Sequence, residues 1–165
     1  MMQFRKYATG GVLMLILATM FYSCTTDLSY YQKQVSIPDA HWHSKFQPVF
    51  QIEITDSGKQ YTPYLLIRHD ESYPNSNIWL NVQVKVPGDT VFGPIQRIEF
   101  ELADAEGKWE GVAVGGIWEH LIPFSVAPNE VFRSPGMYEV KLEQVMRKDP
   151  LPAVLNVGIR LQPKN

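Results

Sequence analysis

The sequence contains a single cysteine, Cys24, in 165 residues. Without a second cysteine the chain forms no internal disulfide, so packing and hydrogen bonds must hold its folded part together. It also lacks an excess of basic residues, because 15 lysines and arginines face 17 acidic residues, for a formal net charge of −2. Phosphate backbones are bound by clustered positive charge. We therefore expect no nucleic-acid partner.

Sequence signatures of catalysis are missing as well. The G-x-S-x-G elbow that exposes a serine nucleophile does not occur. Gly115-Gly116 is not followed by the lysine of a phosphate-binding loop. The acidic residues are scattered rather than paired. We expect no enzymatic activity, no cofactor and no small-molecule substrate.

One pair of histidines has the spacing of metal ligands. His41 and His43 flank Trp42, and residues two apart share one face of a strand. Zinc sites need three or four ligands, and no further ligand is evident nearby. We expect no metal site here, and we expect Trp42 to be a core anchor between two solvated histidines.

The longest apolar run lies at the N-terminus. Arg5 and Lys6 precede the apolar residues 11–22, and Ser23-Cys24 follows them. This order is typical of a secretory signal peptide, and the run is shorter than the roughly 20 residues that span a bilayer. A lone cysteine at this point resembles that of a bacterial lipobox and predicts lipidation of Cys24 after cleavage. The alternative is an ordinary signal peptide that contains a cysteine.

These features predict three segments. Residues 1–23 form the signal peptide, residues 24–40 form a tether after the lipidated cysteine, and residues 41–165 form one folded domain. The alternative for the tether is that a first strand already begins near residues 34–37. Removal of Arg5 and Lys6 lowers the formal charge to −4. Because two or more acyl chains anchor a protein stably, we expect the domain to lie outside the cytoplasm, on a membrane surface.

Alternation of apolar and polar residues recurs along residues 41–165. It is clearest over residues 78–86 and is repeated over residues 50–55, as expected for half-buried strands. About seven or eight such strands predict an antiparallel β-sandwich, with a closed barrel as the second choice. Residues 121–127 contain Pro123 and predict an edge or irregular strand. A short helical turn is expected over residues 116–120.

A loop rich in turn-forming residues precedes the strand at residues 78–86. Asn and Ser side chains there are expected to bond the local backbone. Arg68 and His69 lie nearby, either in a surface charge cluster or with Arg68 bonding this loop. Trp79 falls on the polar face of its strand, and exposed tryptophans often mark binding surfaces. The candidate interaction surface comprises Tyr73, Pro74, Asn75, Asn77, Trp79, Trp109 and Trp118.

Several short motifs behind the signal peptide occur in a familiar order. Arg68-His69 precedes YPNSNI at 73–78, then LAD at 102–104 with GKW at 107–109, YEVKLEQ at 138–144 and VGIR at 157–160. Together they resemble the GldH-type gliding motility lipoproteins of Bacteroidetes. The resemblance implies a part in gliding motility and in the linked type IX protein secretion machinery of the outer membrane, without enzymatic activity.

Two functions from different classes follow as expectations. The first is an interaction module on the periplasmic side of the outer membrane, which contacts other gliding or secretion envelope proteins. The second is a carbohydrate-binding lipoprotein that stacks sugars on Trp79, Trp109 and Trp118. A coplanar pair of exposed tryptophans would favour the second function, because sugar rings stack on flat exposed aromatic faces.

Overall fold

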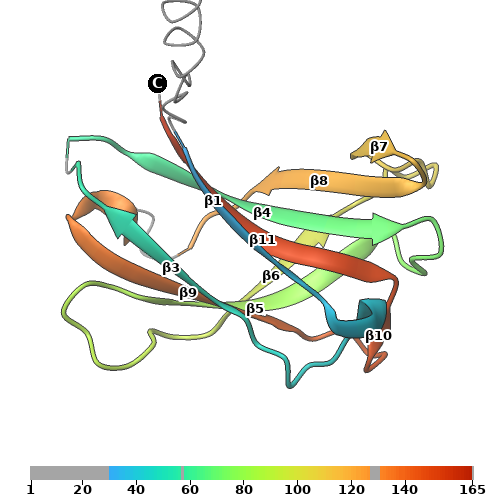
Figure 1. Ribbon diagram of the computed structural model, residues 1–165, viewed down its shortest axis with the longest axis horizontal. Coiled ribbons are helices and arrows are strands. Elements are labelled where there is room, and N and C mark those ends of the chain that lie inside the picture. Colours follow the sequence, from blue (N-terminus) through green and yellow to red (C-terminus); the bar gives the residue numbers. More distant parts are fainter. Residues whose placement is uncertain (1–29, 57, 127–130, 165) are drawn as a thin grey trace, which may run out of the picture.

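The computed structural model describes residues 30–56, 58–126 and 131–164. Two antiparallel sheets face each other in a sandwich (Figure 1). The first sheet has the order β1 (Tyr31–Ser36), β11 (Val154–Pro163), β4 (Tyr61–Asp70), β8 (Ile117–Pro123) and β7 (Val112–Val114). The second has the order β3 (Val49–Ile54), β9 (Gly136–Gln144), β5 (Asn77–Lys85) and β6 (Gln96–Glu101). The predicted antiparallel β-sandwich is confirmed.

Smaller elements close one corner of the sandwich. The two-residue strands β2 (His41–Trp42) and β10 (Leu151–Pro152) pair with each other. Two 3₁₀ turns, η1 (Pro38–Ala40) and η2 (Val131–Arg133), are the helical segments of the described chain. None of the helices in the described residues is long and apolar enough to cross a membrane.

The core is built from the inward-facing residues of each strand. In β5, Ile78, Leu80 and Val82 are fully buried, while the residues between them face outward. Trp42 is completely buried, and its Nε1–H donates a hydrogen bond to the carbonyl oxygen of Phe46 at 2.8 Å. The histidines on either side, His41 and His43, are exposed. The prediction of Trp42 as a core anchor between two solvated histidines is confirmed.

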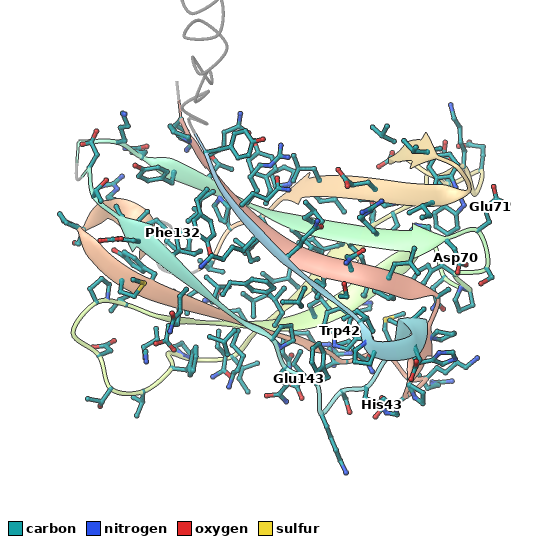
Figure 2. All side chains as sticks on the ribbon, in the orientation of Figure 1. Trp42, His43, Asp70, Glu71, Phe132 and Glu143 are labelled. Carbon is teal, nitrogen blue, oxygen red and sulfur yellow. The ribbon has the colours of Figure 1, made fainter. Side chains whose placement is uncertain are left out.

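The strands define two opposite ends of the sandwich. Tyr31 at the start of β1 pairs with Leu161, and Tyr61 at the start of β4 pairs with Pro163. We call this the proximal end, because the chain enters the domain here (Figure 1). β4 has ten residues and ends at Asp70, which lies at the opposite, distal end (Figure 2). At about 3.3 Å per residue, the two ends are roughly 30 Å apart.

One sequence-based expectation for a single segment is wrong. Residues 116–120 form no helical turn, because Gly115 and Gly116, with φ of 60° and 78°, make the tight turn of the β7–β8 hairpin. β8 therefore begins at Ile117, and β7 pairs with it only as far as Glu119. Residues 121–123 lie at an open edge and residues 124–126 belong to no strand, which agrees with the edge or irregular strand expected over residues 121–127 as far as the structure describes them.

The boundary of the folded domain also needs correction. β1 falls inside the segment 24–40 that the sequence assigns to a tether, yet all six of its residues pair with β11. The polar composition of this segment is explained by its place at the edge of the sheet, where four of the six side chains are exposed. The folded part thus begins before residue 41.

Candidate functional site

The predicted surface residues separate into two places. Tyr73, Trp109 and Trp118 come together at the distal end. Asn77 and Trp79 lie on the outer face of β5, which points away from the core. In the loop between β4 and β5, Pro74 is exposed and Asn75 is half-buried.

The outer-face pair is held by neighbours on β6. The Asn77 side-chain amide donates a hydrogen bond to the carboxylate of Glu99. The guanidinium of Arg97 lies 5.1 Å from the centre of the Trp79 ring, in a cation–π contact. Trp79 is half-buried, and the Arg97 guanidinium covers one face of its indole ring.

A pair of buried histidines lies at the centre of the distal residues. His69 of β4 and His120 of β8 are 0% and 3% exposed, and their Nε2 atoms are 3.0 Å apart. His69 Nδ1 lies 2.8 Å from the carbonyl oxygen of Asp70. A carbonyl only accepts hydrogen bonds, so Nδ1 carries the His69 proton and His69 Nε2 accepts. The proton between the rings consequently belongs to His120.

Burial keeps both imidazoles neutral. Desolvation, together with a smaller effect of the neighbouring His69, lowers the pKa of His120 to about 4. Desolvation also lowers the pKa of His69, although hydrogen bonding to the Asp70 carbonyl and the charge of Asp70 partly oppose this shift. At neutral pH the pair is an uncharged hydrogen-bonded unit that links β4 to β8.

Aromatic rings enclose this pair. The His69 ring lies 5.0 Å from that of Tyr73 and 4.5 Å from that of Trp109, which meets it edge-on. Tyr73 is buried, and its hydroxyl donates a hydrogen bond to the Asn77 carbonyl at 2.9 Å. Burial raises the Tyr73 pKa, so the hydroxyl stays protonated. We call His69, Tyr73, Trp109, Trp118 and His120 the distal cluster.

The backbone approaches the distal cluster closely at Gly111. A Cβ atom at this position would lie 2.6 Å from the carbonyl oxygen of Glu119 and 2.9 Å from the His120 ring. Glycine is thus required for the segment after Trp109 to lie this close to β8. The five side chains of the distal cluster pack against one another through contacts between their rings.

The expected charge cluster at Arg68 and His69 is wrong for His69, because the two side chains point to opposite faces of β4. Arg68 faces outward, and its Nε lies 3.6 Å from the carboxylate of Glu119. It does not bond the Asn75–Asn77 loop; that loop is held instead by Ser76, whose carbonyl accepts hydrogen bonds from the backbone of Leu102 and Ala103.

The β7–β8 hairpin next to the distal cluster exposes two valines. Val112 and Val114 are 71% and 72% exposed. They lie on the outer face of the sheet, since they pair with Glu119 and Ile117 while the intervening Ala113 pairs with Trp118. Sequence reasoning missed this tip, although a Gly-Gly dipeptide after alternating small and apolar residues is a hairpin signal.

The geometry offers little for sugar stacking or for metal binding. Trp109 and Trp118 are both half-buried, and their planes meet at 47° with centres 6.5 Å apart. They do not form a coplanar platform. Within residues 30–164, where the structure describes them, no group of three or more His, Cys, Asp and Glu side chains is placed to hold a metal ion.

These features define the class of the described domain: an antiparallel β-sandwich with a packed aromatic cluster at one end and an exposed apolar hairpin beside it. The chain belongs to the GldH lipoprotein family, whose family model matches residues 29–161.

Curated relatives agree with this membership over nearly the full length. The gliding motility lipoprotein GldH homolog of Christiangramia forsetii is 26% identical and covers 92% of this chain and 94% of its own. The gliding motility lipoprotein GldH of Flavobacterium johnsoniae is 24% identical, over 97% and 99%. The resemblance drawn from the sequence motifs is confirmed.

Among solved structures, a carbohydrate-binding module specific for non-crystalline cellulose aligns with 81% of this chain and 73% of its own. It has a TM-score of 0.42 and 12% identity. A TM-score of this size establishes no common function.

Proposed function

We propose that this chain is a non-enzymatic accessory of the gliding motility and type IX secretion machinery. In this proposal a lipid on Cys24, which lies outside the described residues, holds it on the periplasmic face of the outer membrane. The domain contacts other envelope proteins through its distal end. Membership in a family of gliding motility lipoproteins supports the cellular context.

The position of the distal cluster is the observation that carries this proposal. The chain enters the folded domain at the proximal end, where β1 begins at Tyr31. β4 then crosses the domain and places His69 at the distal end, roughly 30 Å away. A membrane anchor joined to the proximal end would direct the distal end away from the lipid surface, toward other proteins.

The chemistry of the distal end suits protein contacts. Val112 and Val114 expose apolar surface on the short outermost strand β7. Contiguous exposed apolar residues mark interaction sites more often than isolated ones do. Beneath them the packed distal cluster provides a rigid support, which reduces the entropy lost when a partner binds.

Complementation of a strain that lacks the gene tests this function. We expect the wild type to restore spreading on agar and secretion of type IX cargo. The double variant Val112→Lys/Val114→Lys should fail to restore them while it accumulates in the outer membrane at normal levels. The matched control is Val91→Lys, because Val91 is 71% exposed but lies in the β5–β6 loop.

Full complementation by the double variant would contradict a role for the distal end. Normal spreading and secretion in the deletion strain itself would contradict the whole proposal.

A further inference from the structure

An open groove of about 460 Å³ lies between the two sheets, along β6 and the second half of β8. Its lining comprises residues 98–101 of β6, Glu110, and residues 120–124. His120 belongs both to this lining and to the distal cluster. The groove is therefore continuous with the proposed interaction end of the molecule.

Two strands border the groove with unpaired edges. β6 is the last strand of its sheet and pairs with β5 alone. β7 pairs with β8 only over residues 117–119, so the remainder of that β8 edge is open. In the part of the chain that the structure describes, no other strand pairs with either edge. Over residues 98–101 of β6 and residues 121–123 of β8, these edges retain backbone groups that an added strand can bond.

The floor and rim of the groove differ in chemistry. Phe100 and Phe124, whose rings meet edge-on at 5.6 Å, supply apolar surface together with Ile98 and Ile122. The rim carries Glu99, Glu101 and Glu110, all exposed. No lysine or arginine is among the lining residues. An occupant complementary to this groove has apolar and basic side chains in alternation, because successive side chains of a strand point to opposite faces.

We propose that this groove accepts an extended segment of a partner protein, in which lysine or arginine alternates with apolar residues, by strand addition to β6. Strand addition gains its affinity from backbone hydrogen bonds and its specificity from alternate side chains. The inference rests on the proposed function as a protein-contact module and names the chemistry of the partner.

A synthetic decapeptide of alternating lysine and valine, capped at both ends, is the probe. We titrate it into the mature lipoprotein in detergent at low salt and follow binding by calorimetry and amide hydrogen exchange. We expect saturable one-to-one binding, with exchange slowed at the amides of β6. A peptide of the same sequence with N-methyl groups on alternate residues keeps the charge but loses strand donors, and we expect it not to bind.

Charge variants locate the site. Glu101→Lys with Glu110→Lys should weaken binding by about tenfold, since each change removes an attraction and adds a repulsion. Glu99 is left intact because it accepts the hydrogen bond of Asn77. Glu53→Lys is the matched control: Glu53 is exposed on β3, the other edge strand of the same sheet. We expect it to change the affinity by less than about twofold.

Three results would overturn strand addition at β6. They are absence of binding by the lysine–valine peptide, equal binding by its N-methylated form, and equal weakening by Glu53→Lys. The peptide assay contains no cellular machinery, so its failure is distinct from failure of the proposed function, which the complementation assay reports.

Discussion

Acid should destabilise this domain through the buried histidine pair. The pKa of His120 falls from its ordinary value of 6.5 to about 4 in the folded protein because of burial. Between these two values the unfolded chain binds a proton that the folded chain does not. The free energy of unfolding therefore rises with pH across this window, and the stability present above pH 6.5 is lost as the pH falls toward 4.

The magnitude follows from linkage. The pKa of His120 differs by about 2.5 between the unfolded and the folded chain. At about 1.36 kcal/mol per pKa unit, this lowers the free energy of unfolding by about 3 kcal/mol once His120 is protonated in both states. At pH 4.5 the expected loss is about 2–3 kcal/mol relative to pH 7.5. Since small domains are stable by only about 5–15 kcal/mol, this loss is readily measured by urea unfolding of a soluble form that begins at residue 25.

His120→Gln isolates this effect. Glutamine does not titrate, and its amide can still donate a hydrogen bond to His69 Nε2. The variant should lose about 2–3 kcal/mol less than the wild type between pH 7.5 and pH 4.5. Equal pH dependence of the wild type and His120→Gln would refute the inference that burial lowers the pKa of His120.

Three further predictions concern packing and anchoring. Gly111→Ala should destabilise the domain by about 1–3 kcal/mol in thermal unfolding, because its Cβ would lie 2.6 Å from the Glu119 carbonyl oxygen. Gly58→Ala is the control and should show no comparable loss, because its Cβ would meet only the Asp56 side chain, at 3.2 Å. Trp42→Ala should cost about 3–5 kcal/mol in urea unfolding, and a loss below about 1 kcal/mol would contradict its role in the core. Metabolic palmitate should label the wild type and not Cys24→Ala, and label on the variant would exclude acylation at Cys24.

Local alternation was sufficient to predict much of the fold. Residues 50–54 and 78–84 alternate between core and solvent as their side-chain pattern indicates, because period-two patterning is a local property of a half-buried strand. β1 is harder to predict: the sequence favours a tether over residues 24–40, with a first strand near residues 34–37 only as an alternative, because an edge strand with mostly exposed residues carries little apolar signal.

The centre of the distal cluster could not be predicted in this way. His69 and His120 are 51 residues apart, and they meet only because His69 pairs with Trp118 in the β4–β8 register. No local pattern encodes that register. Tyr73, Trp109 and Trp118 were selected for their aromatic rings and turn neighbours, whereas the histidines that join them were assigned to the surface or passed over.

Photo-crosslinking in living cells tests the central claim most directly. A photoreactive amino acid replaces Val114 at the distal tip or, as the matched control, Val91 in the β5–β6 loop; both valines are more than 70% exposed. After irradiation, adducts of this lipoprotein are purified from outer membranes and identified by mass spectrometry. The account predicts a discrete adduct with a gliding or type IX secretion protein from position 114 and none from position 91. The same adducts from both positions, or none from position 114, would contradict it.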